Sequence, residues 1–143
     1  MNRPHSTSDL SPNDAAGLVA RSLEASLSVR DLSASVAWYR DVIGFSVLRE
    51  YRRDEKVFAV ALQAGSVELL LTQDDGAKGL DRAKGDGFSL QLTTPQHIDE
   101  LAARIKARGG VLESEPFVMA GKRAFRLRDP DGFRFTISSP RGA

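Results

Sequence analysis

Residues 23–29 read Leu23-Glu24-Ala25-Ser26-Leu27-Ser28-Val29, a strict alternation of apolar and polar residues. This alternation predicts a β-strand with one buried and one polar face. A helix is predicted next, because Asp31 suits an N-cap, apolar residues follow at helical spacing up to Ile43, and Gly44 can end the helix. Three more strands are predicted at residues 45–51, 57–63 and 67–72, with short turns between them.

The same order of elements recurs in the second half of the chain. Residues 88–93 alternate like the first stretch, Thr94-Pro95 predicts a helix start with proline at the first helical position, and Gly109 ends that helix. Strands follow at residues 111–118, 123–128 and 133–138. The sequence therefore predicts an α+β fold of two tandem βαβββ modules, at about residues 22–72 and 87–138. We expect a curled mixed sheet around a trough, with the helices on the outside.

The remaining segments are predicted to be irregular. Residues 1–20 have no sustained period and are expected to be a loose N-terminal extension, so the folded domain is placed at residues 21–140. The linker at residues 74–86 is rich in Gly, Lys and Asp and can be mobile. The turn at residues 129–132, Asp-Pro-Asp-Gly, is explained by tight-turn chemistry alone. Trp38 and Tyr39 are expected in the core.

Composition excludes several classes of function. Twenty Lys and Arg residues are interspersed with 19 Asp and Glu residues, for a net charge of +1, so there is no basic stripe for nucleic acid. The absence of cysteine excludes disulfides and thiolate chemistry. No apolar run is long enough to cross a bilayer and the N-terminus has no signal-type apolar region, so we expect a cytoplasmic protein without a membrane partner.

Strand alternation also predicts which side chains face the trough. In each module the apolar face of the first and last strands must meet the helix, so the other face turns inward. The serines can be merely solvated, whereas the two glutamates either bind a ligand or form an ion pair with the arginine. The candidate ligand-binding residues are Glu24, Ser26, Glu68, Leu70, Ser89, Gln91, Arg134 and Thr136.

Two motifs resemble the vicinal oxygen chelate superfamily, which includes glyoxalase I, extradiol dioxygenases, fosfomycin-resistance enzymes and bleomycin-resistance binding proteins. They are Ser28-Val29-Arg30-Asp31-Leu32-Ser33-Ala34-Ser35-Val36-Ala37-Trp38-Tyr39-Arg40-Asp41-Val42-Ile43-Gly44-Phe45 and Arg126-Leu127-Arg128-Asp129-Pro130-Asp131-Gly132-Phe133. The resemblance covers about residues 22–140. It implies the two-module fold, a small-molecule ligand and a homodimer, because members commonly complete their troughs across a two-fold interface.

The resemblance also implies where a metal ion would bind. Carried over position by position, the usual His, Glu, His and Glu ligands of the family become Glu24, Glu68, Gly87 and Thr136. Only the second of these keeps its family residue, and a divalent ion needs three or four converging ligands. The two histidines do not replace the missing ones, because His5 lies in the extension and His97 is expected to be exposed in the first turn of the second helix. No cofactor is therefore expected; the alternative is a divalent metal ion held weakly by the two glutamates.

These observations favour a metal-independent small-molecule-binding protein that resembles the bleomycin-resistance type. The alternative is a glyoxalase-like lyase or isomerase, or a dioxygenase. Its catalytic residues would be Glu24 and Glu68, either around a weakly held metal ion or with one of them as a general base and Arg134 stabilising an oxyanion. A third hypothesis is a regulatory module that acts through protein contacts.

Overall fold

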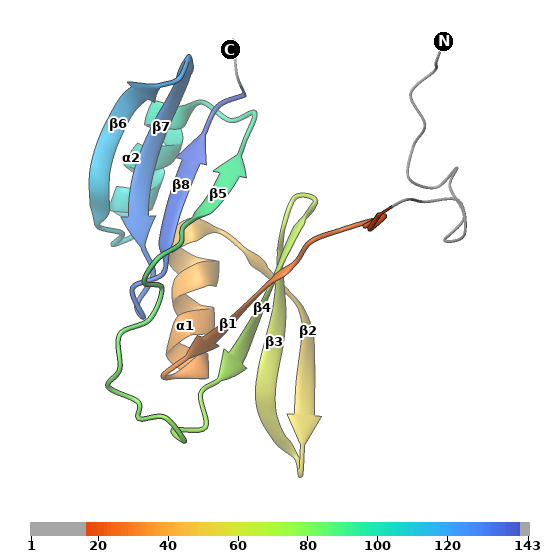
Figure 1. Ribbon diagram of the computed structural model, residues 1–143. Coiled ribbons are helices and arrows are strands. Elements are labelled where there is room, and N and C mark those ends of the chain that lie inside the picture. Colours follow the sequence, from red (N-terminus) through yellow and green to blue (C-terminus); the bar gives the residue numbers. More distant parts are fainter. Residues whose placement is uncertain (1–16, 141–143) are drawn as a thin grey trace.

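The computed structural model describes residues 17–140, which form two four-stranded sheets and two helices (Figure 1). The elements of the first module are β1 (Ala25–Val29), α1 (Leu32–Trp38), the π-helical turn η2 (Tyr39–Ile43), β2 (Ser46–Arg53), β3 (Lys56–Ala64) and β4 (Val67–Gln73). Those of the second are β5 (Leu90–Thr93), α2 (Ile98–Ala107), β6 (Leu112–Met119), β7 (Lys122–Arg128) and β8 (Arg134–Ser138).

Both modules have the same topology. The strand order is β1-β4-β3-β2 in the first sheet and β5-β8-β7-β6 in the second, with one parallel pair, β1 with β4 and β5 with β8, and otherwise antiparallel pairs. The first strand of each module is an edge strand, because it pairs on one side only. The α+β class and the repeated βαβββ unit predicted from the sequence are confirmed.

The helix ends follow local capping chemistry. The Asp31 side chain accepts a hydrogen bond from the Ala34 backbone N–H at 3.0 Å, as expected of an N-cap. The helix then widens into η2, and Gly44 ends it with a φ of 102°, a conformation that glycine adopts without strain.

The predicted start of the second helix at Thr94-Pro95 is wrong. The Thr94 backbone still donates to the Ser138 carbonyl at 2.9 Å, which extends the β5–β8 pairing, and its hydroxyl accepts from the Gln96 N–H at 3.1 Å. The helix starts at Ile98 instead, with His97 as its N-cap.

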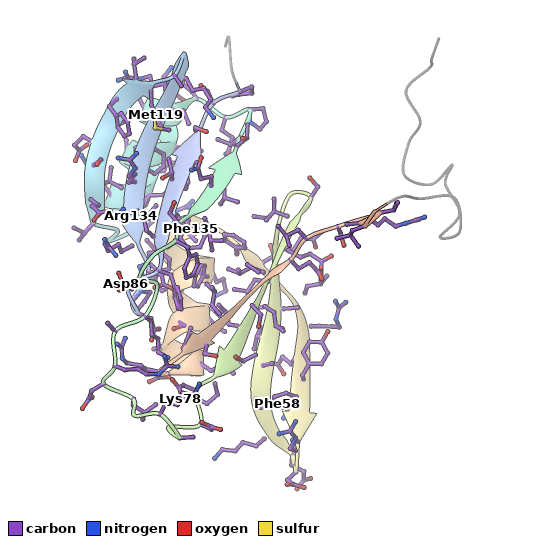
Figure 2. All side chains as sticks on the ribbon, viewed as in Figure 1. Phe58, Lys78, Asp86, Met119, Arg134 and Phe135 are labelled. Atoms are coloured by element: carbon purple, nitrogen blue, oxygen red, sulfur yellow. The ribbon has the colours of Figure 1, made fainter. Side chains whose placement is uncertain are left out.

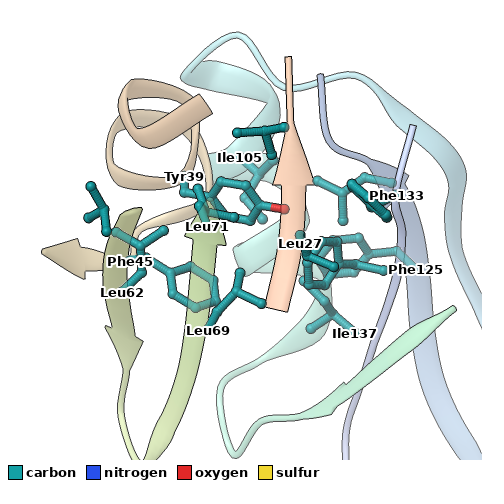
Figure 3. Packing of buried hydrophobic residues seen from close by; sticks show 14 of the residues in the cluster. Leu27, Tyr39, Phe45, Leu62, Leu69, Leu71, Ile105, Phe125, Phe133 and Ile137 are labelled. Carbon is teal, nitrogen blue, oxygen red and sulfur yellow. The ribbon is translucent and has the colours of Figure 1, made fainter. Parts of the chain in front are cut away.

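One hydrophobic core serves both modules. Buried side chains of β1, β3, β4 and the first helix form a single cluster with those of α2, β7 and β8 (Figure 3). Tyr39 is 0% exposed at the centre of this cluster, and its ring meets Phe45 of its own module and Phe135 of the other edge-on, with centroids 5.6 and 5.9 Å away. The expectation that Tyr39 belongs to the core is confirmed, and the first helix packs against both modules.

The 129–132 turn is more than a tight turn, which corrects the sequence interpretation. Its two carboxylates are buried and bind the first module: the Tyr39 hydroxyl donates to Asp129 at 2.7 Å, and Arg30 donates to Asp131 through its backbone N–H at 2.9 Å and its guanidinium at 3.1 Å. Burial raises the pKa of Asp129, while the hydrogen bonds from Tyr39 and the backbone oppose that shift. These carboxylates therefore fix the two modules to each other.

The linker between the modules has no helix or strand but is tied to the body. Arg30 donates to the backbone carbonyls of Leu80 at 2.7 Å and Arg82 at 2.8 Å, and a buried ion pair joins Lys84 to Asp74. The linker is therefore held to the body by specific side-chain contacts.

The ends of three predicted strands extend beyond the core. Leu23, predicted to meet the helix, is 98% exposed, because β1 begins two residues later. Phe88 and Val67 were likewise predicted to be core residues and are 49% and 38% exposed. The alternation of apolar residues continues past the residues that pair, so it overestimates how far each strand is covered.

Among residues 17–140, no helix is long and apolar enough to cross a membrane.

Candidate functional site

Four of the predicted site residues line one cleft on the polar face of the first sheet. Glu24, Ser26, Glu68 and Leu70 surround a space of about 320 Å³. Its floor is Ala61 of β3, a small residue paired with Leu70, which gives the cleft its depth. The strand alternation thus brings these four residues together along one cleft.

Two residues that the sequence analysis did not identify complete this cleft. Arg49 and Tyr51 lie on β2, and the Arg49 guanidinium donates to the Tyr51 hydroxyl at 2.8 Å. It also lies 3.7 Å from a carboxylate oxygen of Glu68. The cleft therefore contains two carboxylates and a single guanidinium, all partly open to solvent.

On the polar face of the second sheet, charged groups pair with one another. Arg134 does not pair with either glutamate of the first module, which corrects that expectation; it donates to both oxygens of Glu113 at 2.8 and 3.1 Å. Arg128 donates to the same carboxylate at 2.9 Å. The hydrogen bonds from Arg134 and then Arg128 lower the pKa of Glu113 to about 2.

A third arginine lies further along this face. Arg126 is partly buried and donates through Nε to the Thr136 hydroxyl at 3.3 Å, while its guanidinium carbon lies 4.9 Å from the centroid of the Phe117 ring. Thr136 was predicted to face the trough and does so by register, since it pairs with Arg126 and Gln91 on neighbouring strands. Arg126 covers it, however, and Thr136 is only 3% exposed.

The remaining predicted residues, Ser89 and Gln91, are exposed near the start of β5. Ser89 lines a second polar cleft of about 700 Å³ with Arg128, Arg134 and Asp86. In Figure 2, Arg134 and Met119 lie toward opposite ends of the second sheet, so the contacts of Arg134 and those of Arg126 with Met119 occupy different parts of it. Within the described residues, Glu24, Ser26, Glu68 and Leu70 thus line one cleft and Ser89 and Arg134 line another, whereas Gln91 and Thr136 line neither of the two.

This separation bears on the predicted catalytic arrangement. Glu68 and Arg134 belong to different clefts, so one chain does not bring the proposed general base and the proposed oxyanion-stabilising group together. A third and more apolar cavity of about 460 Å³ lies at the junction of the modules, between Phe45, Val67 and Leu92, and none of the eight predicted residues lines it.

The residues present do not fit the usual metal site. No three His, Cys, Asp or Glu side chains within residues 17–140 are grouped so that they could hold an ion. At the position of the fourth family ligand, the Thr136 hydroxyl accepts a hydrogen bond from the Arg126 guanidinium, whose positive charge would repel a divalent cation. His97 is exposed at the helix N-cap, as predicted, and His5 lies outside the described residues.

Comparisons with known proteins agree with this fold. The model of the Glyoxalase/Bleomycin resistance protein/Dioxygenase superfamily matches residues 21–137. A probable lactoylglutathione lyase of Vibrio cholerae is 30% identical over 125 residues, which cover 82% of this chain and 88% of that protein. A lactoylglutathione lyase of Arabidopsis thaliana is 27% identical over 125 residues, but the match spans only 43% of that relative's length.

Solved structures share the architecture. A superfamily member from Sphaerobacter thermophilus has a TM-score of 0.67 at 24% identity, with 85% of this chain and 98% of that chain covered. A virulence protein from Salmonella typhimurium has a TM-score of 0.65 at 23% identity, covering 86% and 98%. At these identities the likeness establishes the fold alone.

Proposed function

The chain belongs to the Glyoxalase/Bleomycin resistance protein/Dioxygenase superfamily, and we propose that it is a small-molecule-binding protein that works without a metal ion. The observation that carries this proposal is the replacement of the metal-ligand set. Glu68 keeps its family residue, but Glu24 and Gly87 stand where histidines are usual, and the fourth position is a buried threonine that accepts a hydrogen bond from Arg126. A fixed positive charge thus stands where a metal-binding member would place an anionic ligand.

The binding site that we propose is a trough shared by two copies of the chain. The two polar faces line separate clefts with different charged groups: Glu24, Glu68 and Arg49 line the first, and Lys84, Asp86, Arg128 and Arg134 line the second. Among residues 17–140, the edge strands β1 and β5 each pair with another strand on one side only. Pairing the first sheet of one copy with the second sheet of another would satisfy both features.

Metal content of the purified, untagged protein tests metal independence. We expect no stoichiometric Zn²⁺, Ni²⁺, Mn²⁺ or Fe²⁺ as isolated, and no saturable binding of these ions at micromolar concentration. One ion per chain that disappears in both Glu24→Ala and Glu68→Ala would contradict the proposal.

Sedimentation tests the shared trough. We expect a species of twice the 15.6 kDa chain mass at micromolar concentration. A single species at the chain mass would overturn the two-copy arrangement, while metal independence would be judged by the metal measurement alone.

The second candidate is a lyase or isomerase of the glyoxalase type, favoured by the lactoylglutathione lyase relatives and by the retained glutamate at position 68. Formation of lactoylglutathione from methylglyoxal and glutathione, with each of the four metal ions, tests it in wild type and in Glu68→Gln. Activity that falls at least about 100-fold in the variant would favour the enzyme, as expected for loss of a general acid or base. Equal activity in both would remove Glu68 from the chemistry.

A further inference from the structure

Arg126 has an incomplete set of partners. Its Nε donates to the Thr136 hydroxyl at 3.3 Å, and Nη2 reaches only the thioether sulfur of Met119 at 3.5 Å. A thioether is a weak acceptor, and Nη1 has no acceptor among the described residues. The edge of the guanidinium that carries Nη1 and Nη2 is therefore available to a ligand.

The charge around Arg126 is not compensated by the protein. The one carboxylate paired on this face, Glu113, is shared by Arg128 and Arg134. Within residues 17–140, Arg126 lies within ion-pair distance of no acidic side chain, whereas the other two arginines of the face do. A partly buried guanidinium without a counter-ion is unfavourable unless something else supplies the negative charge.

Neighbouring contacts hold the guanidinium in one orientation. The ring of Phe117 lies under it at 4.9 Å, and the Thr136 hydroxyl fixes its Nε side. Cation–π stacking of this kind leaves the in-plane N–H groups free to bind two oxygen atoms at once. The group is thus oriented for a planar or tetrahedral oxyanion.

We infer that Arg126 binds the carboxylate or phosphate group of a small organic anion, whose uncharged part lies against Phe117 and Met119. This inference rests on the proposed function, because it names the ligand class of the same trough. Arg126, Phe117 and Met119, none of them among the predicted site residues, are thereby added to the proposed binding site. Arg126 would be a specificity-determining residue of that site.

Titration of ¹⁵N-labelled protein with benzoate, phenyl phosphate and the neutral benzamide tests the inference by NMR. We expect the two anions to shift resonances of Arg126, Phe117 and Thr136, and to bind at least about tenfold more tightly than benzamide. A stronger response to phenyl phosphate or to benzoate identifies which oxyanion the site prefers.

Variants at position 126 separate recognition from packing. Arg126→Gln should weaken the binding of benzoate at least about tenfold and leave the binding of benzamide unchanged. A purely structural role of Arg126 would not produce this difference. Arg126→Lys keeps the positive charge but cannot bind an oxyanion in the bidentate geometry of a guanidinium. Its benzoate affinity should therefore lie between those of wild type and Arg126→Gln. The matched control is Arg123→Gln on the same strand, whose arginine pairs with Asp99 of α2 and should not affect anion binding.

The inference would be overturned if benzoate bound wild type and Arg126→Gln with equal affinity. If Arg126→Gln also dissociated a dimer in that case, Arg126 would pair with a carboxylate of a second copy.

The inference would also be overturned if the resonance shifts were confined to the first-sheet cleft. The same holds if no anion bound at about 10 mM, a concentration that detects even very weak complexes. Anion binding confined to the first-sheet cleft would leave the proposed binding function standing. Arg126-dependent binding in a monomer would support this inference while removing the two-copy trough.

Discussion

The two modules share their topology and differ in the face that is turned away from the helices. In the first sheet that face contains Glu24 and Glu68, with Arg49 of the outer strand β2 beside them and Arg53 in a neighbouring cleft next to Ser28. In the second it contains three arginines, two of them on the inner strand β7, with one glutamate. The helix-facing sides of both sheets, by contrast, join in one apolar cluster.

This difference separates residues that determine the fold from residues that are free to change. A side chain in the common core contacts neighbours from both modules, so its replacement disturbs the whole domain. A side chain on the opposite face contacts solvent and a few neighbours on its own sheet. The polar faces can therefore acquire different charged residues while the architecture stays the same.

The largest effect is expected from the common core. Phe125 is 0% exposed in the second sheet, and Phe125→Ala should lower the free energy of unfolding by about 3–5 kcal/mol. The exposed Gln91→Ala on the opposite face should change it by less than about 0.5 kcal/mol. Denaturant unfolding of both variants should give one transition, and two transitions in Phe125→Ala would show that the modules unfold separately.

A smaller effect is expected at the hydroxyl that joins the modules. Tyr39→Phe keeps the ring but removes the donor to the buried Asp129, and should lower the free energy of unfolding by about 2–3 kcal/mol. Tyr51→Phe, which removes an exposed hydroxyl from the first-sheet cleft, is the matched control. A similar decrease in the free energy of unfolding in both variants would contradict a special role for the hydrogen bond from Tyr39 to Asp129.

The linker contact is expected to matter less for stability. Arg30→Gln removes hydrogen bonds to the Leu80 and Arg82 carbonyls and the ion pair with Asp131, at a cost of about 1–2 kcal/mol. Trypsin should then cleave the linker faster, at Lys78 or Arg82, because the segment loses its anchor. Arg40→Gln, at an exposed arginine that pairs with its neighbour Asp41, should leave the cleavage rate unchanged.

The smallest effect is a pH dependence confined to the second face. The pKa of Glu113 is about 2 in the folded protein and near 4.5 when unfolded, so its contribution to stability is present above pH 4.5 and is lost as the pH falls toward 2. Glu113→Gln should make the free energy of unfolding depend less on pH between 4.5 and 2. Salt at about 0.5 M should reduce the difference between wild type and the variant, because the ion pairs are exposed.

The raised pKa of Asp129 has the opposite sign, so its contribution decreases as the pH rises above its unfolded value. Both proteins contain Asp129, so subtracting the free energy of unfolding of Glu113→Gln from that of wild type at each pH removes the contribution of Asp129. An unchanged slope between pH 4.5 and 2 in the variant would contradict the assignment to Glu113.

The sequence predicted the fold well where two constraints acted together. The centres of β1, β4 and β8 had to bury alternate residues against a helix, so their faces were predictable. Leu23 and Phe88 were misplaced because their alternation extends beyond the paired residues. The α2 start was misplaced because Thr94 and Pro95 also suit the bend that follows β5.

The candidate site was less predictable for a geometric reason. Glu24 and Glu68 lie in one cleft as expected, but the partners of the polar residues come from β2, β6 and β7. The first two contain register irregularities, between Val47 and Arg49 and on both sides of Ser114. Alternation cannot be continued through a bulge, so Arg49 and Glu113 could not be assigned to a face from the sequence. Arg126 could have been found, because β7 pairs regularly with β8.

The contacts of Tyr39 and Arg30 also set an order of folding during synthesis. The hairpins β2–β3 and β3–β4 join neighbouring segments, whereas Tyr39 and Arg30 find their partners 90 and 101 residues further along the chain. Local contacts close quickly and distant ones slowly. A nascent chain therefore completes its first sheet while the ring of Tyr39 still lacks its cover. Until Phe135 has left the ribosome, that apolar surface is available to chaperones or to another nascent chain.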